Sequence, residues 1–222
     1  MARIEILAGM GSGKTSLADL LVKNGFTHIE EDFENNPFLE QIYEDGQENW
    51  LEYGITNVMI HYNQLRKNDD ADKDYVFDFS ILLDRAYAES HLEINAISEK
   101  ELAVYDKLDK LVREKMPKVD LRIHLVCKPE EQKRRILERG REYEKDISLD
   151  FLKMMARNTK RFLDERGNDT KVLVIDTGKY DYVNNPVHQK IVLNMIMQAL
   201  GRGGPNIKPS PRRGGPGPGF RP

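Results

Sequence analysis

The segment from residue 8 to residue 15, Ala-Gly-Met-Gly-Ser-Gly-Lys-Thr, constrains the fold more than any other part of the chain. It matches the phosphate-loop pattern G-x-x-x-x-G-K-[ST], with Ala8 in place of the first glycine. A β-rich run at residues 3–8 precedes it, and the residues after Thr15 have apolar side chains at helical spacing. Strand, glycine-rich turn and helix in this order open a βαβ unit. The alternative, a chance glycine-rich turn, does not explain the intact Gly-Lys-Thr.

The residue types of this loop suit a nucleoside triphosphate. Glycines let successive backbone N–H groups point at phosphate oxygens, and the following helix presents its positive end. We expect the Lys14 ammonium to reach the β- and γ-phosphates and the Thr15 hydroxyl to ligate Mg²⁺. The residues expected to bind the phosphates of ATP are Gly9, Met10, Gly11, Ser12, Gly13, Lys14, Thr15 and Ser16.

Strand-like and helix-like segments alternate along the rest of the chain. Further strands are predicted at residues 26–31, 74–79, 119–127 and 171–176, and helices at 37–43, 47–67, 98–115, 129–140, 148–166 and 186–200. Gly54 interrupts the helical propensity of the second of these helices. In the last one, Val187, Ile191, Met195 and Ala199 are expected on one face. The alternation predicts an α/β fold of the P-loop NTPase type, a parallel sheet with helices on both faces.

Composition excludes several other classes. The chain has 222 residues and one cysteine, Cys127, which rules out an internal disulfide framework. We expect no membrane span and no signal peptide, because no apolar run approaches the required length of about 18 residues and the N-terminus leads into a strand. A cytoplasmic location is the corresponding prediction.

Charge divides the chain into two parts. Residues 1–200 contain 29 basic and 37 acidic side chains, so we do not expect this part to bind nucleic acid. Residues 201–222 contain five basic and no acidic residues, with seven Gly and six Pro. We therefore predict one domain over residues 1–200 and a disordered Gly/Pro/Arg-rich tail over 201–222, whose partner, if it has one, stays open.

Three arginines follow a pattern of their own in the segment from Arg135 to Glu144. Arg135, Arg139 and Arg141, spaced by four and two residues, can converge on one anion, as phosphoryl transfer requires. A solvated basic helix face is the alternative. Beside a phosphate loop in the same domain, we favour an arginine-rich lid.

Two segments together resemble the deoxyribonucleoside kinase family, in particular bacterial deoxyadenosine and deoxyguanosine kinases. The first is the run from Glu30 to Leu39 with Asn-Asn-Pro, leading to Tyr43-Glu44-Asp45, and the second is R-x-x-x-R-x-R-x-x-E from Arg135 to Glu144. The resemblance covers residues 1–200. It implies ATP- and Mg²⁺-dependent phosphorylation of a deoxynucleoside 5′-hydroxyl, and a homodimer.

Glu31 is the candidate general base. A 5′-hydroxyl loses its proton as it attacks the γ-phosphorus, and a carboxylate at the carboxyl end of a strand lies at the mouth of the sheet. Strand alternation puts the neighbouring Glu30 on the opposite face. The alternative is a surface carboxylate pair.

The resemblance also implies a set of nucleoside ligands. Tyr43 and Glu144 would hold the sugar 3′-hydroxyl. Arg66 matches the arginine that reads the base, but Met59 occupies the place of the family's glutamine, so Asn57 is the replacement in a shifted register. Arg66 paired with Asp84 resembles members that accept purines, which favours deoxyadenosine or deoxyguanosine.

The segment after the third predicted strand departs from the family. Asp78, Ser80 and Asp84 match, but Phe79 replaces an arginine that would lie near the transferred phosphoryl group. Arg85 or a lid arginine is the candidate replacement. Asp78 is expected to act as the acid linked to Mg²⁺, with helix capping as the alternative.

These departures keep two other functions open. One is a nucleoside monophosphate kinase of the thymidylate type, which needs a further arginine for the phosphate of its acceptor. The other is a nucleotide-binding module without catalysis, suggested by Phe79. Because Lys14, Thr15, Glu31 and the arginine pattern are all present, the nucleoside kinase is our prediction.

Overall fold

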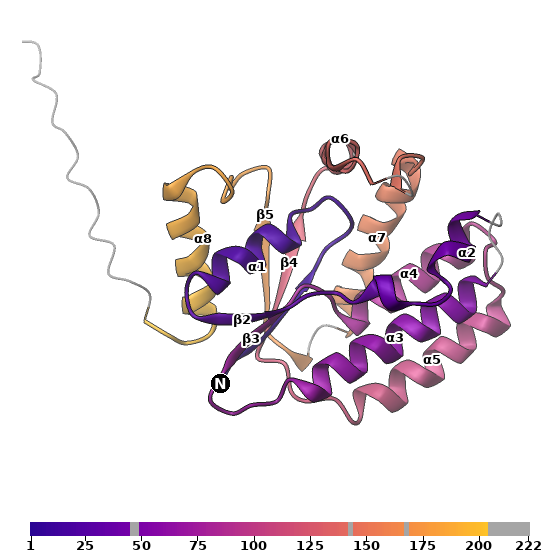
Figure 1. Cartoon of the computed structure of the whole chain (residues 1–222), viewed down its shortest axis with the longest axis horizontal. Helices are drawn as coiled ribbons and strands as arrows, with labels where there is room; N and C mark the ends of the chain where they lie inside the picture. Colours follow the sequence, from indigo (N-terminus) through magenta and orange to yellow (C-terminus); the bar gives the residue numbers. More distant parts are fainter. Residues whose placement is uncertain (45–48, 142–143, 167–168, 204–222) are drawn as a thin grey trace, which may run out of the picture.

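Five parallel strands form the single sheet at the centre of the computed structural model, which describes residues 1–44, 49–141, 144–166 and 169–203. The strands lie in the order β2-β3-β1-β4-β5 (Figure 1). Their bounds are Arg3–Leu7 (β1), Phe26–Ile29 (β2), Asp74–Phe77 (β3), Leu121–Val126 (β4) and Val172–Asp176 (β5). Every neighbouring pair is parallel, so all five carboxyl ends meet at one edge. The predicted α/β fold is confirmed.

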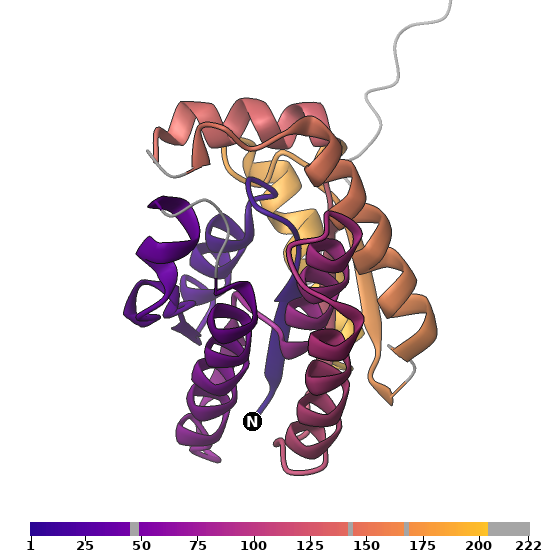
Figure 2. The ribbon, with the colours of Figure 1, turned by 90° about the vertical axis from the view of Figure 1, so that its right-hand side faces the viewer.

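Helices cover both faces of this sheet. One face carries α1 (Lys14–Val22) and α8 (Pro186–Ala199), and the other α3 (Trp50–Lys67), α4 (Ile81–Glu93), α5 (Glu99–Arg113) and α7 (Leu149–Arg166) (Figures 1 and 2). A short 3₁₀ turn at Phe33–Asn35 and α2 (Leu39–Glu44) follow β2. Helix α6 (Pro129–Arg139) crosses the edge where the strands end, above the loop between β1 and α1 (Figure 2). No helix of the described residues is long and apolar enough to cross a membrane.

The core follows from strand alternation. Ile4 and Ile6 of β1 are fully buried and belong to the apolar cluster shared with α1 and α8. Leu7, one position on, belongs to a separate cluster with Leu82 and Leu163 on the other face. Because successive strand residues point to opposite faces, the central strand β1 buries both sides. The loop that follows Leu7 therefore starts from a fully buried strand.

The structure corrects three expectations about the elements. Helix α4 is present where no helix was predicted. The strands β2 and β3 end at Ile29 and Phe77, so Glu31 and Asp78 lie in the loops just beyond them. Helix α8 packs on the core through Val192, Leu193 and Ile196, and the expected Met195 and Ala199 are partly buried against it. Val187 is 64% exposed and does not share this face.

Candidate active site

The glycines of the phosphate loop are required by its backbone and by a close neighbour. Gly11 and Gly13 have φ angles of +72° and +93°, which side-chain-bearing residues rarely adopt. A Cβ atom on Gly11 would lie 2.6 Å from the backbone carbonyl oxygen of Gln132 in α6. The loop is therefore pressed against α6 and has no room for side chains at this position.

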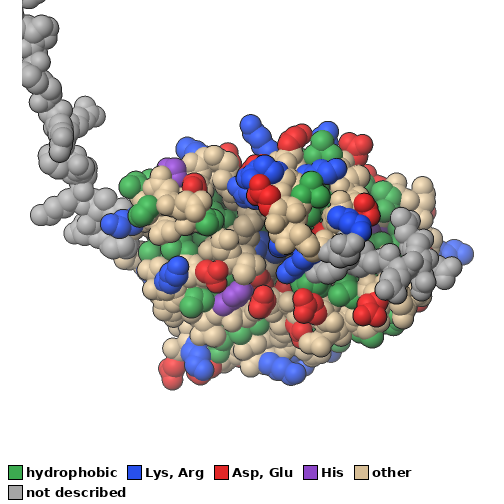
Figure 3. Space-filling view, turned by 45° about the horizontal axis from the view of Figure 1, so that its top comes forward, with side chains coloured by type: hydrophobic (Ala, Val, Ile, Leu, Met, Phe, Trp, Pro, Cys, Tyr) green, Lys and Arg blue, Asp and Glu red, His purple; other side chains and the backbone are tan. Residues whose placement is uncertain are grey.

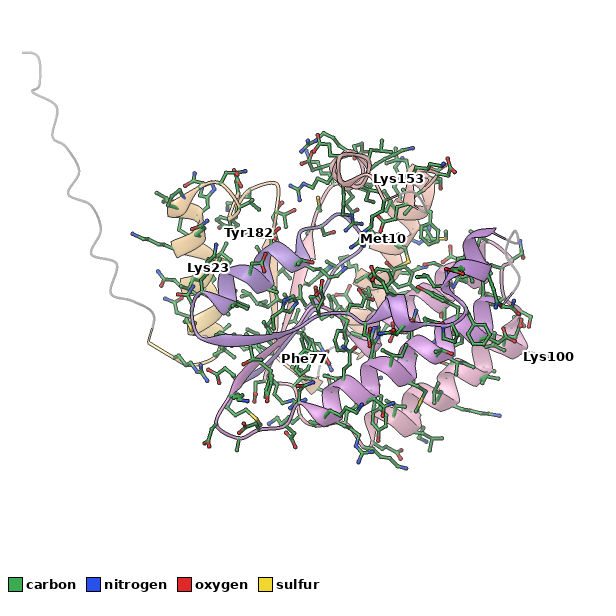
Figure 4. All side chains as sticks on the ribbon, in the orientation of Figure 1. Met10, Lys23, Phe77, Lys100, Lys153 and Tyr182 are labelled. Atoms are coloured by element: carbon green, nitrogen blue, oxygen red, sulfur yellow. The ribbon has the colours of Figure 1, made fainter. Side chains whose placement is uncertain are left out.

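Two side chains that the sequence did not single out hold this loop in shape. Gln132 Nε2 donates to the Met10 carbonyl oxygen at 3.0 Å and to Ser12 Oγ at 2.7 Å. The Tyr182 hydroxyl, from the segment between β5 and α8, donates to the Gly13 carbonyl oxygen at 3.0 Å (Figure 4). The only signal for Gln132 in the sequence is its place three residues before Arg135, on the same helix.

The end of the loop meets Asp78. Thr15 Oγ1 donates to Asp78 Oδ2 at 3.3 Å, and the Glu31 backbone N–H donates to Asp78 Oδ1 at 2.8 Å. Burial opposes ionisation of Asp78, but nearby His28 and Lys14 outweigh it and hold the pKa of this carboxyl below its usual range. A hydroxyl and an ionised carboxylate are the oxygen donors that Mg²⁺ takes, with phosphates and water completing its shell. No group of three or more His, Cys, Asp or Glu side chains in the described part of the chain forms a separate metal site.

A cavity of about 700 Å³ extends from the phosphate loop to the helices α3 and α4. Charged side chains gather on this face of the molecule, around its hollow (Figure 3). The predicted residues that line the cavity are Met10, Gly11, Ser12, Gly13, Lys14, Thr15, Ser16, Glu31, Asn57, Asp78, Asp84, Arg135, Arg139, Arg141 and Glu144. Predicted residues between Met10 and Glu144 thus line one cavity, while Gly9 of the phosphate loop does not line it.

Glu31 lies in this cavity near the phosphate loop, with its side chain 33% exposed. Burial raises its pKa, but the neighbouring His61 and the Lys14 ammonium have the larger combined effect and lower it below the usual value. Glu30 lines the cavity as well. The expected separation of the two glutamates by strand alternation is wrong, because β2 ends before both of them.

His61 of α3 contacts two acids of the cavity wall. Its Nδ1 lies 2.8 Å from Asp84 Oδ2, and its Nε2 lies 3.6 Å from Glu31 Oε1. The imidazole is buried and stacks on Phe79 with ring centroids 4.4 Å apart. Burial disfavours its charge, but Asp84 and Glu31 raise the pKa of His61 to about 10. A histidine inside a helical pattern carries no motif, so the sequence alone does not point to His61.

The arginines of the predicted lid pair with glutamates. Arg135 Nε donates to Glu131 Oε1 at 2.8 Å, Arg139 bonds Glu144, and Arg141 Nη1 lies 3.5 Å from Glu144 Oε1. Since all three arginines line the cavity, the structure brings them together beside the phosphate loop.

Asn57 and Asp84 are the predicted nucleoside ligands that the structure places in the cavity wall at its far end. Asn57 Oδ1 accepts from Asn36 Nδ2 at 2.7 Å, which fixes the orientation of the Asn57 amide. Aromatic side chains surround this end: Trp50, Tyr53, Tyr87, His91, Tyr105 and Phe151. The Tyr43 side chain lies outside the described part of the structure, although its backbone belongs to α2.

The structure does not bring Met59 and Arg66 to the cavity. Both are exposed on α3, and the Arg66 guanidinium lies over the Tyr62 ring at 5.4 Å. Asp84 pairs with His61 instead of Arg66. The structure therefore does not bring Met59 and Arg66 together with the other predicted nucleoside ligands, because α3 turns His61 toward Asp84.

Arg85 does not replace the missing arginine at position 79 either. It is buried, and its side chain pairs with Glu89 at 3.1 Å and with Asp106 at 2.9 Å. Its guanidinium also lies over the Phe162 ring. These contacts hold the Arg85 charge away from the cavity.

Comparison with known proteins decides the family. The family model described as deoxynucleoside kinase matches residues 4–200. The chain belongs to the deoxynucleoside kinase family. It is 30% identical over 206 residues to a deoxyguanosine kinase of Lactobacillus acidophilus, covering 88% of this chain and 90% of the relative. It is 28% identical over 190 residues to a deoxyguanosine kinase of Bacillus subtilis, covering 82% and 89%.

Solved structures support the same fold. A deoxyadenosine kinase from M. mycoides superimposes with a TM-score of 0.77 at 22% identity, over 88% of this chain and 99% of that one. The resemblance, the fold and the ATP-dependent deoxynucleoside kinase function predicted from the sequence are therefore confirmed. The alternative of a module without catalysis loses its support.

Proposed function

We propose that this kinase transfers the γ-phosphoryl group of ATP to the 5′-hydroxyl of a purine deoxynucleoside, with Glu31 as the general base. The observation that carries the proposal is the place of Glu31 in the cavity, near Lys14 of the phosphate loop. The 5′-oxygen attacks the γ-phosphorus, its proton passes to the Glu31 carboxylate, and ADP leaves. The low pKa of Glu31 supports its ionised form before the reaction.

Residues 9–16 would hold the triphosphate, through backbone N–H groups and the Lys14 ammonium. Thr15 and Asp78 would hold Mg²⁺, since their oxygens lie 3.3 Å apart at the end of the loop. When bound, Mg²⁺ supplies positive charge to the β- and γ-phosphate oxygens. Asp78 would also orient Glu31, because it accepts the Glu31 backbone N–H.

The arginines at positions 135, 139 and 141 would clamp the transferred group. Their present partners, Glu131 and Glu144, keep the three guanidinium groups beside the cavity. Phosphate oxygens that arrive with ATP would compete for the same donors. In this arrangement Glu144 is free to accept the sugar 3′-hydroxyl, together with Tyr43.

Asn57 and Asp84 are the proposed readers of the base. The Asn57 amide oxygen accepts from Asn36, which leaves its N–H₂ group as a donor. Asp84 uses one carboxylate oxygen for His61, and its other oxygen is an acceptor. A donor and an acceptor together can pair with the Watson–Crick edge of either purine, since guanine and adenine both carry a donor and an acceptor there. The names of the relatives from L. acidophilus and B. subtilis point to guanine.

The acceptor is the nucleoside rather than its monophosphate. The basic side chains that line the cavity within the described ranges are Lys14 and the arginines of the lid. Phe79 holds the position of a further arginine, and Arg85 is turned away. An acceptor phosphate would therefore lack a cation of its own. Formation of a homodimer and a cytoplasmic location remain predictions, and sedimentation of the purified protein tests the first of them.

One assay tests the reaction. The purified protein is incubated with ATP and Mg²⁺ and, separately, with each deoxynucleoside and each deoxynucleoside monophosphate, and release of ADP is measured. We expect turnover with deoxyguanosine and deoxyadenosine above that with pyrimidines. Turnover with monophosphates alone would contradict the proposed acceptor, and preference for a pyrimidine would contradict the proposed base.

A further inference from the structure

A buried histidine, His61, contacts two acidic residues of the active-site cavity without lining the cavity itself. Glu31 and Asp84 both line the cavity, and His61 does not. The His61 side chain is 1% exposed, yet it faces Asp84 Oδ2 at 2.8 Å and Glu31 Oε1 at 3.6 Å. A residue in this place cannot touch the substrate, but it sets the distance between the two carboxylates.

The imidazole is held in one orientation by its surroundings. The Phe79 ring stacks on it with an interplanar angle of 16°, and Phe79 in turn packs edge-on against Phe77. Both phenylalanine side chains are at most 1% exposed. Since the ring cannot swing, each nitrogen keeps its own carboxylate.

The contacts also favour the charged form of the ring. An imidazole donates a hydrogen bond from a nitrogen only when that nitrogen carries a proton, and only the imidazolium can donate from both. Both ring nitrogens of His61 face carboxylate oxygens. His61 Nε2 is buried with no hydrogen-bond partner within 3.5 Å in the described structure, so Glu31 at 3.6 Å is the acceptor toward which it points.

We propose that His61 is a positioning residue, an imidazolium that holds the general base Glu31 toward the acceptor hydroxyl and ties it to Asp84. The proposal rests on the proposed function, in which Glu31 is the base. It assigns to His61 the positive charge that Phe79 cannot supply and that Arg85 directs elsewhere. Phe79 and His61 then act together: the Phe79 ring stacks on the imidazolium, and the imidazolium takes the place of the arginine that position 79 lacks.

Kinetics of His61→Gln test this role. Glutamine fills a similar volume and can donate only from its amide, without a charge. We expect kcat to fall on the order of 10²-fold, because a displaced catalytic group has effects of that size. The KM for ATP should stay within about twofold, since His61 does not contact the phosphate loop. His124→Gln, a substitution of a histidine on β4 that does not line the cavity, is the matched control and should keep the wild-type kcat.

A second substitution distinguishes positioning from loss of structure. Phe79→Arg in the His61→Gln background returns a cation to the neighbourhood of Glu31, in place of the Phe79 ring that stacks on the imidazole in the wild type. We expect this double variant to recover kcat by at least about tenfold over His61→Gln. A kcat of His61→Gln equal to that of the control would overturn the proposal, and so would equal losses in kcat and in affinity for ATP.

A spectroscopic measurement covers the case in which the variants fail to fold. In ¹⁵N-labelled wild-type protein at pH 7.5, we expect His61 to show the two protonated nitrogens of an imidazolium. A neutral tautomer would overturn the proposal whatever the kinetics. Absence of turnover in the wild type, with this signature present, would reject the proposed reaction and leave the charge of His61 established.

Discussion

Two histidines on neighbouring helices show how the same side chain serves opposite purposes. His61 is buried between two carboxylates, which raise its pKa to about 10. His91 is buried beside Trp50 and Phe151, where no carboxylate of the described residues pairs with it and burial lowers its pKa to about 4. The first is therefore a fixed cation and the second a neutral part of an aromatic wall.

Substitution of the proposed base has the clearest expected effect at this scale. Glu31→Gln keeps the shape of the side chain but removes its ability to take a proton. We expect turnover to fall by about 10²-fold or more. ATP binding, measured by calorimetry, should be unchanged, because Lys14 and the loop are intact. A variant with wild-type turnover would show that another group takes the proton.

The low pKa of His91 predicts a loss of stability in acid. In the unfolded chain this histidine has the ordinary pKa of about 6.5, so below that pH the unfolded state binds a proton that the folded state resists until about pH 4. The free energy of unfolding should therefore fall as the pH drops from 6.5 toward 4, by about 2 kcal/mol at pH 5. In His91→Phe this part of the fall should be absent. Urea unfolding of both proteins at pH 7.5 and pH 5 measures the difference, and equal falls would contradict the assignment.

At the scale of elements, the packing of α3 against α5 depends on a glycine. An ideal Cβ atom on Gly54 would lie 1.5 Å from the Tyr105 hydroxyl oxygen, and the Tyr105 hydroxyl donates to the Trp50 carbonyl oxygen at 3.3 Å. The glycine lets the two helices approach and places Trp50 and Tyr105 at the end of the cavity.

The Gly54→Ala substitution has two effects of opposite sign on the free energy of unfolding. Alanine favours the helix by about 1 kcal/mol, but overpacking at a buried contact costs about 1–3 kcal/mol or more. Because the overlap is with a buried ring, we expect net destabilisation. Thermal unfolding of Gly54→Ala, Tyr105→Val and the double variant tests this, since removal of the ring should make the double variant more stable than the sum of the two single effects. Simple additivity would mean that the helices separate instead.

A helix could be predicted from the sequence when one of its faces is polar and the other apolar. Helix α5 has one, begins with a capping box at Ser98 and Glu101, and was expected at nearly its observed bounds. Helix α4 is buried among α3, α5 and α7, and eight of its thirteen residues are buried. Its sequence therefore lacks the apolar periodicity of a surface helix. In the structure, the Ser80 side chain caps the start of α4 by accepting a hydrogen bond from the Leu82 N–H.

The residues of the site also fall into two groups, those that the sequence predicts and those that it does not. The phosphate loop and the arginine pattern are local in sequence, so motifs alone single out Lys14, Thr15 and Arg135. The far end of the cavity is built from side chains of α3 and α4, and their rotation depends on how the two helices pack. One such rotation decides that His61 faces Asp84 while Arg66 lies on the exposed side. The spacing of residues along the sequence does not determine this rotation.

For the whole molecule, Arg202 makes the contact with the domain that lies furthest along the chain among the described residues. Its guanidinium donates to Asp74 Oδ1 at 2.8 Å, at the start of β3. The predicted tail from residue 204 onward lies outside the described residues. The domain boundary predicted at residue 200 therefore stays a prediction, and Arg202 belongs on the domain side of any truncation.

Deletion of residues 203–222 should leave turnover within about twofold of the full chain, because none of the residues that line the cavity is removed. Deletion of residues 202–222 is the matched comparison, and the loss of one partly exposed ion pair should lower the free energy of unfolding by about 1 kcal/mol or less. A large loss of turnover in the first variant would mean that the tail takes part in the reaction.

The shared histidine also limits how such an enzyme can diversify. A change of base preference by substitution of Asp84 would release one side of His61, and the ring that loses this partner is the one that faces Glu31. Specificity and rate are therefore not independent traits in this molecule. Laboratory evolution toward a new base should recover compensating changes at positions 61 and 79 before it reaches the turnover of its parent.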